Sequence, residues 1–198
     1  MMCGPKRWSI NDGTSAGSCS IRMPTIWTIG HSSRDLDGFL DLLATHEIGL
    51  VADVRRFPGS KRHPQFGQEH LRQHLANAGI DYRHFADLGG RRSRSRSDSP
   101  NTAWRVESFN AYADHMQSPE FQQDLQQLEA AARQRRTALM CAEALPWRCH
   151  RRLIADALIA RGWTVLDIIG AGRSDEHKLT EFARVERNRV TYPGGTLS

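Results

Sequence analysis

Five short runs of β-branched, aromatic and other apolar residues recur along this chain, separated by longer segments with helical periodicity. Apolar runs of this length, bounded by glycine or charged residues, are typical of buried strands. The runs cover residues 25–30, 50–55, 80–85, 137–143 and 163–170. Strands that alternate with helices imply β-α-β crossovers. The sequence therefore predicts an α/β fold: a single domain with a mainly parallel sheet of about five strands and helices on both faces.

The segments between these runs carry the periodicity and end signals of helices. Leu36, Phe39 and Leu43 are spaced as on one face of a helix. Ser32, three residues before Asp35, resembles the start of a capping box. Helices are expected over residues 34–48, 66–79, 107–116, 118–134 and 146–162, and a short one around 178–186.

The two ends of the chain differ from the middle. The first 22 residues have no periodicity and are rich in glycine, serine and asparagine. They are expected to be a disordered leader, unless translation starts at Met23. The α/β domain is expected to span residues 23–190, followed by a tail over residues 191–198.

The composition narrows the classes of partner. No apolar run approaches the ~18–20 residues that cross a membrane, so no membrane partner is expected. The four cysteines are too few for a disulfide scaffold, and their distribution suits reduced thiols in a cytoplasmic protein. The net charge of +5 favours an anionic small molecule or nucleic acid as partner.

Three of the predicted strands end in reactive or charged residues. These ends are His31-Ser32 after the first strand, Asp53 and Arg55 in the second, and Cys141 to Glu143 in the fourth. Ligands of open α/β sheets bind beyond the carboxyl ends of the strands. The three strand ends are therefore expected to converge on one site.

The junction between the fourth strand and the next helix holds the densest group of such residues. Cys149 and His150 precede the apolar stripe of that helix and are predicted to face inward. Glu143 ends a buried strand, where a carboxylate needs a partner, so it is expected to pair with an arginine. The conservative interpretation is that Cys149 and His150 only pack in the core.

Several motifs at these strand ends resemble the family catalogued as domain of unknown function 488. They are TIGHS (28–32), DVRRFPGSKRHPQF (53–66), LGGRR (88–92), DSPNTAWRVESFNAYADHM (98–116), LMCAE (139–143) and WRCHRRLIADAL (147–158). The resemblance covers roughly residues 24–186. It implies an α/β fold and supports the location of the site, and it implies no particular chemistry.

Metal binding is one interpretation of the junction. Cys141, Glu143, Cys149 and His150 are suitable ligand types for zinc or iron, and His31 could complete the set. Their spacing is not a known zinc pattern. Neighbouring residues on a helix also diverge by about 100°, which argues against Cys149 and His150 reaching the same ion.

Thiol chemistry is a second interpretation. A cysteine between a strand and an arginine-rich helix start has surroundings that lower a thiol pKa, as in cysteine phosphatases and rhodaneses. Six residues separate Cys141 from Arg148, where phosphatase loops have five, and the loop contains Leu-Pro-Trp instead of glycines. Such a loop is poorly suited to surround a phosphate.

Anion or nucleic-acid binding is the broadest interpretation. Ser32 and Ser33 are predicted to cap a helix N-terminus, where an anion is stabilised, and Trp104 and Trp147 could stack on bases. The arginines and lysines of two loops would add positive charge, unless they only form a solvated surface. They are Arg55, Arg56, Lys61, Arg62, Arg91, Arg92, Arg94 and Arg96.

The leading hypothesis is an enzyme that acts on an anionic substrate, such as a nucleotide or nucleic acid. Glu143, with His31 or His150, would transfer protons, Cys141 would be a nucleophile or ligand, and Asp53 would orient a base or an arginine. The expected substrate-binding residues are Ser32, Arg55, Arg148 and Arg151. The alternatives are a non-catalytic nucleic-acid-binding module and a metal-binding redox or regulatory protein. The cofactor is left open.

Overall fold

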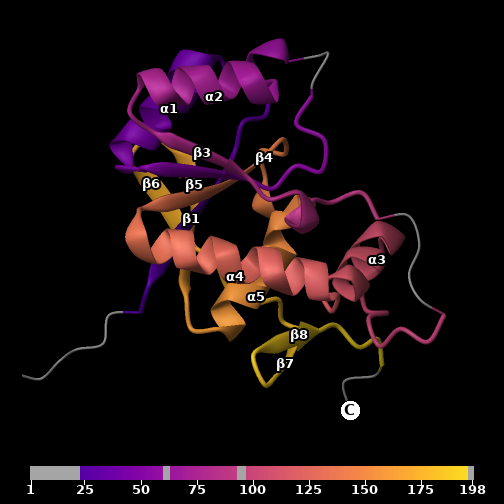
Figure 1. Cartoon of the computed structure of the whole chain (residues 1–198). Coiled ribbons are helices and arrows are strands. Elements are labelled where there is room, and N and C mark those ends of the chain that lie inside the picture. The colour runs from indigo at the N-terminus through magenta and orange to yellow at the C-terminus, as the bar shows by residue number, and fades with distance from the viewer. Residues whose placement is uncertain (1–22, 60–62, 93–96, 196–198) are drawn as a thin grey trace, which may run out of the picture.

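The computed structural model describes residues 23–59, 63–92 and 97–195. Within them a six-stranded sheet forms the centre of the molecule, in the order β3-β2-β4-β1-β5-β6 (Figure 1). The strands are β1 (Thr25–Gly30), β2 (Leu50–Asp53), β3 (Asp81–His84), β4 (Thr137–Cys141), β5 (Thr164–Gly170) and β6 (Arg173–Glu176). The first five are parallel, and β6 is antiparallel to β5. The predicted single α/β domain is confirmed.

The register of the central strands brings the predicted strand ends together. Gly30 at the end of β1 is paired with Cys141 at the end of β4. Asp53 at the end of β2 is paired with Met140, one residue earlier in β4. Parallel pairing in this register places all three carboxyl ends at one edge of the sheet.

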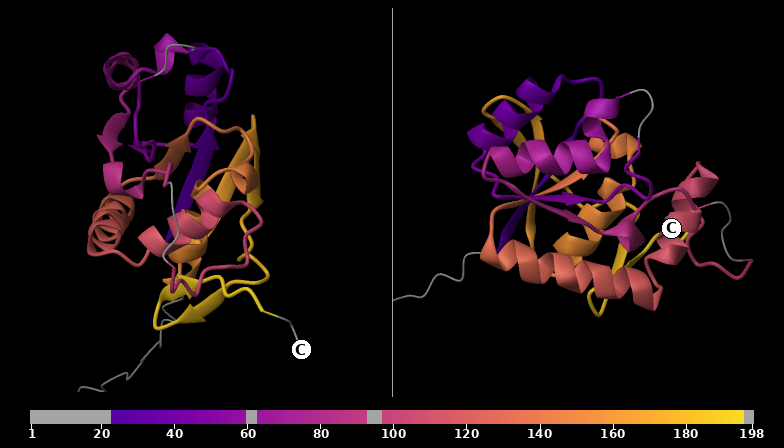
Figure 2. Two further views of the ribbon diagram at one scale, coloured as in Figure 1. Left: turned by 90° about the vertical axis from the view of Figure 1, so that its right-hand side faces the viewer. Right: turned by 45° about the horizontal axis from the view of Figure 1, so that its top comes forward.

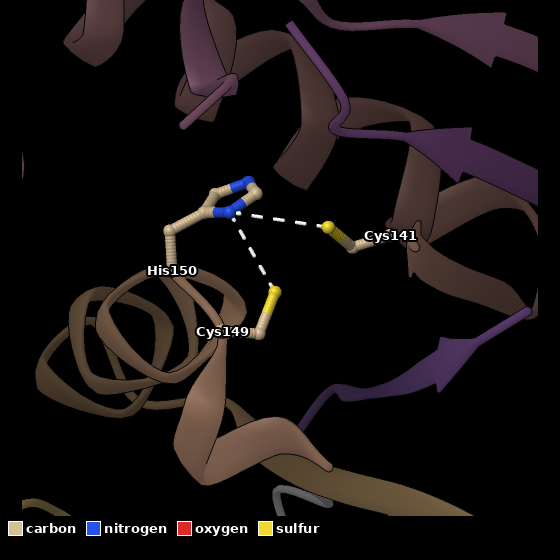
Figure 3. A group of neighbouring side chains, drawn as sticks. All are labelled: Cys141, Cys149 and His150. Carbon is tan, nitrogen blue, oxygen red and sulfur yellow. Dashed lines mark hydrogen bonds between the residues drawn. The ribbon is translucent and has the colours of Figure 1, made fainter. Parts of the chain in front are cut away.

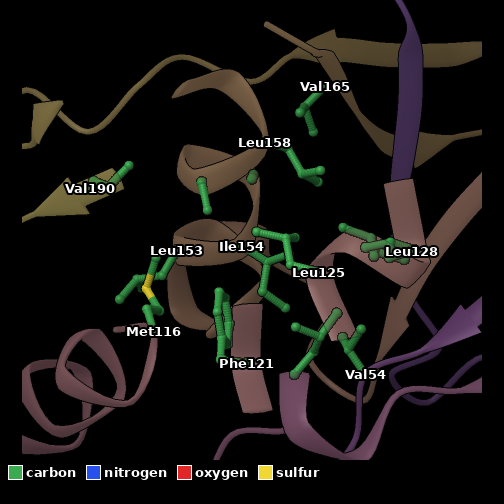
Figure 4. Close-up of a cluster of buried hydrophobic side chains, with 14 of the residues drawn as sticks. Val54, Met116, Phe121, Leu125, Leu128, Leu153, Ile154, Leu158, Val165 and Val190 are labelled. Atoms are coloured by element: carbon green, nitrogen blue, oxygen red, sulfur yellow. The ribbon is translucent and has the colours of Figure 1, made fainter. Parts of the chain in front are cut away.

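Helices cover both faces of the sheet, as expected (Figures 1 and 2). On one face α1 (Leu36–Thr45) and α2 (Gln68–Asn77) bury Phe39, Leu43, Leu71 and Leu75. On the other face α4 (Pro119–Gln134) and α5 (Arg151–Ala160) pack against β4 and β5, and α3 (Glu107–His115) lies beside them. Figure 4 shows this second core, which includes Phe121, Leu125, Ile154 and Leu158. Three short 3₁₀ helices, η1 (Pro64–Phe66), η2 (Ala86–Leu88) and η3 (Pro146–Arg148), lie in the connections.

The helix after β1 begins later than predicted. Asp35, and not Ser32, is its N-cap, because the Asp35 side chain accepts a hydrogen bond of 2.7 Å from the Gly38 N–H. Ser32 has a φ of 50° and its N–H donates to the Ala142 carbonyl. The expectation that Ser32 and Ser33 cap a helix is therefore wrong, because this backbone turns toward β4 before the helix begins.

The helix predicted over residues 146–162 is interrupted. The 3₁₀ helix η3 ends at Arg148, Cys149 has extended backbone angles (φ −128°, ψ 147°), and α5 starts at Arg151. His150 directly precedes α5 and makes no side-chain capping bond, and Cys149 supplies acceptors to the first turn. Its Sγ accepts the Arg151 N–H at 3.5 Å, and its carbonyl accepts the Arg152 N–H. This break changes the direction of the Cys149 side chain.

The expected short helix near residues 178–186 is also wrong. Two strands form a hairpin there, β7 (Arg184–Glu186) and β8 (Arg189–Thr191). Arg187 and Asn188 both have positive φ at its turn, as a type I′ turn requires. Tyr192, in the segment expected to be a tail, is fully buried, and its hydroxyl donates to Asp156 at 2.8 Å. Among the described residues, every helix is too short or too polar to span a membrane.

A buried polar network lies between α5 and the β5–β6 edge of the sheet. The Nδ1 of His177 donates to Asp167 at 2.7 Å, and its Nε2 lies 3.8 Å from Asp156. Thr28 on β1 donates to the other oxygen of Asp167 at 2.6 Å. Burial alone would lower the pKa of His177, but the nearby carboxylate of Asp156 and the hydrogen bond to Asp167 raise that pKa to about 9. The histidine is therefore an imidazolium at neutral pH.

Candidate functional site

A cavity of about 790 Å³ opens at the carboxyl edge of the sheet. Its wall includes residues that follow β1, β2 and β4, Gly90 and Arg91 after η2, and residues at the start of α3. The arginines that line it are Arg55, Arg56, Arg91 and Arg148. Glu143 is the one carboxylate among the described lining residues, so positive charge predominates in the pocket.

Two thiols and an imidazole meet in the wall of this pocket (Figure 3). The Nδ1 atom of His150 lies 3.6 Å from the Sγ of Cys149 and 3.9 Å from the Sγ of Cys141. Both cysteines are free and buried. The expectation that Cys149 and His150 diverge is wrong, because Cys149 is extended and not helical. The side chains of the two neighbours therefore point to the same place.

The tautomer of His150 follows from its second nitrogen. The Nε2–H donates a hydrogen bond of 2.8 Å to the carbonyl oxygen of Val54, just after β2. A carbonyl can only accept, so a neutral imidazole carries its proton on Nε2. Its Nδ1 therefore presents a lone pair to the two sulfur atoms.

The sulfur atoms of Cys141 and Cys149 lie within 4.8 Å of each other, and the pKa values of the two thiols shift in opposite directions. The neighbouring Cys141 thiol lowers the pKa of Cys149 well below its usual value, against the effect of burial, and the Arg151 guanidinium lowers it further. The interaction with the Cys149 thiol, followed by burial, raises the pKa of Cys141 well above its usual value. The two thiols therefore titrate as a pair, and the pair loses its first proton more readily than its second.

Arg151 lies next to this pair and is 1% exposed. Its Nη2 donates to the Glu143 carbonyl at 2.6 Å and to the Ala144 carbonyl at 3.4 Å, while its Nε has no hydrogen-bond partner. No carboxylate among the described residues forms an ion pair with it. The predicted ion pair of Glu143 with an arginine is wrong, because the Glu143 side chain is exposed on the pocket wall. Arg151 therefore stabilises the backbone of the 143–144 loop.

Asp53 lies behind the pocket and holds Arg55. The Nε of Arg55 is 2.9 Å from Oδ1 of Asp53, and its Nη2 is 2.6 Å from Oδ2. The Tyr82 hydroxyl also donates to Asp53, at 2.7 Å. Arg55 Nη1 donates to the Phe66 carbonyl at 2.8 Å. These contacts leave only part of the Arg55 guanidinium facing the pocket.

His31 is buried against Phe66, with the two rings stacked at 4.3 Å. Its Nδ1–H donates to the Ser32 carbonyl at 3.0 Å, and its Nε2 lies 3.5 Å from Nη1 of Arg55. Burial is the main cause that lowers the pKa of His31 to about 4. The ring is therefore neutral at pH 7, and its Nε2 lone pair accepts a hydrogen bond from the Arg55 guanidinium.

The structure brings together most of the residues predicted from the strand ends. The pocket wall contains His31, Ser32, Arg55, Cys141, Glu143, Arg148, Cys149 and His150. Asp53 and Arg151 lie behind this wall. Trp104 does not face the pocket but packs against Phe109, Phe182 and Tyr192. The expected contributions of Lys61, Arg62, Arg94 and Arg96 lie outside the described residues.

Three features of the site were not predicted. Tyr112 packs its ring 5.2 Å from that of His150. Gly90 lies so close that a Cβ there would be 2.8 Å from the Nδ1 of His150. Phe57 lines the mouth of the pocket and is 66% exposed. The adjacent pair Gly89-Gly90 was the one available signal, since glycine often marks a close approach of the backbone to another group.

A comparison with known protein families shows to which family this chain is related. Residues 35–158 match the family described as "Domain of unknown function DUF488". The chain belongs to this family. The DUF488 match extends from the N-cap of α1 to α5 and includes Arg55, Cys141, Cys149 and His150. No curated protein and no solved structure matches the chain.

Proposed function

We propose that this DUF488 protein is an enzyme that acts on an anionic substrate held in the basic pocket, with Cys141, Cys149 and His150 as its reaction centre. One observation carries the proposal. The cluster of two thiols and an imidazole forms part of the wall of a cavity whose described lining residues include four arginines and one carboxylate. Folds with a parallel sheet bind their ligands at the carboxyl edge of the sheet, and the cluster lies at this edge.

Arg148 and Arg56 are the arginines best suited to contact the anion. Arg148 is exposed and Arg56 is half-buried, and both line the pocket. Arg55 is 6% exposed and gives most of its donors to Asp53 and to the Phe66 carbonyl. We assign it mainly to the shape and positive potential of the site. A planar guanidinium can bind a phosphate or carboxylate through two hydrogen bonds.

Glu143 is the group that we assign to proton transfer. Its side chain is exposed in the pocket wall and two residues beyond Cys141. The loop that carries it is held by Arg151, which binds the carbonyls of residues 143 and 144. A general acid or base must reach the reacting atom from a fixed position. His31 is less suited to this role because it stays neutral and its Nε2 faces Arg55.

A panel of anions tests this proposal. The protein is mixed with orthophosphate, pyrophosphate, nucleoside mono- and triphosphates and short oligonucleotides. Binding is measured as a rise in melting temperature. Compounds that bind are incubated with the protein and analysed for products by mass spectrometry. We expect at least one class to bind and to be converted.

Matched variants separate binding from turnover. Arg148→Ala should lose binding, while Arg72→Ala, which removes an exposed arginine on α2, should bind like the wild type. Cys141→Ser should bind the same compound without converting it. Unchanged binding by Arg148→Ala, or a bound anion that wild-type protein never converts, would reject the enzyme proposal.

Exposed aromatic rings favour a second candidate, a non-catalytic nucleic-acid-binding module. Trp147 is 54% exposed beside Arg148, and Phe57 is 66% exposed beside Arg56. Aromatic rings next to arginines are the elements with which proteins stack single-stranded bases. This candidate predicts oligonucleotide binding that weakens steeply with salt. Binding should fall in Trp147→Ala and stay unchanged in Cys141→Ser, whereas binding insensitive to salt would reject it.

A further inference from the structure

We infer that Cys141, Cys149 and His150 bind one divalent metal ion, best matched by Zn²⁺, with an open coordination position toward the pocket. The three candidate ligand atoms all lie within 4.8 Å of one another. Glu143, which was expected as a fourth ligand, is not part of this group. The inference rests on the proposed function only for the catalytic use of the ion. Metal binding itself is a separate property of the cluster.

The distances fit a tetrahedral zinc site. With Zn–S bonds of about 2.3 Å and Zn–N bonds of about 2.0–2.1 Å, tetrahedral angles separate a nitrogen and a sulfur ligand by about 3.6 Å. The observed separations are 3.6 Å to Cys149 and 3.9 Å to Cys141. The cluster therefore needs only small side-chain adjustments to hold the ion.

The surroundings of the ligands are those of a metal site. Metal-binding histidines usually donate their second N–H to a carboxylate or backbone carbonyl, which fixes the ring and its tautomer. His150 makes this contact with the Val54 carbonyl at 2.8 Å. The N–H of Arg151 points at the Cys149 sulfur at 3.5 Å and so fixes that ligand too. Both ligands are thus positioned by backbone groups of neighbouring elements.

Space beside the nitrogen ligand depends on Gly90. A Cβ at this position would lie 2.8 Å from Nδ1, 3.1 Å from Cγ and 3.2 Å from Cε1 of His150. A methyl group would therefore press on the edge of the ring that presents the lone pair. Glycine leaves that edge free for the ion and for whatever occupies its fourth position.

Three protein ligands distinguish this arrangement from a structural zinc site. Structural sites use four protein ligands, while catalytic sites use three and leave a position for water or substrate. Here all three ligand residues line the same cavity, together with the arginines assigned to the anion. Two thiolates and an imidazole also favour zinc over the hard cations Mg²⁺ and Ca²⁺, which prefer oxygen ligands.

Metal titration of the full chain tests the inference. Cys3 and Cys19 lie outside the described residues and would also bind metal, so the background variant is Cys3→Ser/Cys19→Ser. The reduced, metal-free protein is titrated with Co²⁺, followed by its visible and thiolate-to-metal absorption, and Zn²⁺ then displaces the Co²⁺. We expect one ion per chain with tetrahedral thiolate spectra, lost in Cys149→Ser and in His150→Ala.

Two further measurements keep the inference falsifiable if those variants unfold. X-ray absorption of the zinc-loaded background variant should show two sulfur ligands together with nitrogen or oxygen. A shell without sulfur would overturn the site. Gly90→Ala retains all three ligands but should weaken metal binding by about tenfold or more. Gly59→Ala, where the added methyl meets nothing within 4 Å, should bind like the background; equal affinity of the two variants would overturn the site.

The failures of the two proposals are distinguishable. The anion panel is repeated on metal-free protein and on zinc-loaded protein. No zinc binding, with anion binding and turnover intact, overturns the metal site alone. Zinc bound with two sulfur ligands, with no anion bound or converted, supports the metal site and rejects the proposed enzyme.

Discussion

Asp53 and Arg55 form a buried ion pair, in which Oδ2 of the aspartate lies 2.6 Å from Nη2 of the arginine and both side chains are at most 7% exposed. The residues are two apart, at the end of β2 and just beyond it. This ion pair fixes the Arg55 side chain in the wall of the pocket. Breaking a buried ion pair from one side leaves an uncompensated charge.

Asp53→Asn should therefore destabilise the protein by about 3–5 kcal/mol. Tyr82→Phe removes one hydrogen bond to the same carboxylate and should cost about 1 kcal/mol. Both free energies of unfolding are measured by urea denaturation. An Asp53→Asn protein as stable as Tyr82→Phe would show that Arg55 finds another partner.

The network around His177 should make stability depend on pH. The pKa of this histidine is raised to about 9, against 6.5 for an unperturbed ring. The folded state thus holds the proton more tightly. The stabilisation is fully present below about pH 6.5 and is lost as pH rises toward 9, by up to about 3 kcal/mol.

The measurement compares the wild type with His177→Gln in urea titrations from pH 6 to pH 9.5. The difference between their unfolding free energies should shrink across this range, because only the wild type loses the proton of His177. Asp156 and Asp167 face the ring, Tyr192 donates to Asp156 and Arg152 donates to Thr180, and all four residues remain in both proteins. A difference that stays constant with pH would contradict the raised pKa.

Gly30 should not tolerate a side chain. A Cβ there would lie 2.0 Å from the Glu143 carbonyl oxygen and 2.8 Å from the Ala144 Cα. Since backbone atoms cannot move aside as a flexible side chain can, Gly30→Ala should cost about 3 kcal/mol or more. Gly170→Ala, at the end of β5, meets nothing within 4 Å and is the matched control. Equal melting temperatures for the two variants would mean that the 143–144 loop lies elsewhere.

Glu143→Gln should leave the fold intact. The side chain is exposed and forms no ion pair within the described part of the chain, so the free energy of unfolding should change by less than about 0.5 kcal/mol. In the turnover assay the same variant should bind the substrate and fail to convert it. Unchanged turnover would remove Glu143 from the mechanism, and a large loss of stability would make it a structural residue.

The spacing of apolar residues was sufficient to predict the parallel sheet. The reactive and charged residues at the strand ends were sufficient to predict the edge at which the candidate site lies. The runs that became β1, β2 and β4 are buried on both faces, and such strands have a strong apolar signal. By contrast β6, β7 and β8 are short and mostly exposed, with charged residues along them. Their pattern does not differ from that of a polar loop.

The geometry of the cluster could not be derived from the sequence for a different reason. The apolar period of α5 extends backward through Cys149, so a continuous helix from Pro146 was the natural prediction. What interrupts it is a tertiary arrangement. The Val54 carbonyl accepts a hydrogen bond from His150, the residue immediately before α5. Contacts between segments about a hundred residues apart leave no local pattern.

The hydrogen-bond partners of Asp156 also determine when α5 can pack stably on the sheet during synthesis of the chain. This carboxylate is fully buried in α5, and it accepts hydrogen bonds from the Thr180 N–H and the Tyr192 hydroxyl, 24 and 36 residues later in the chain. An unpaired buried carboxylate is costly. We therefore expect α5 to dock stably on the sheet only after Tyr192 has left the ribosome. A nascent chain that ends before that point should stay sensitive to protease in α5, even though every strand of the sheet has already been made.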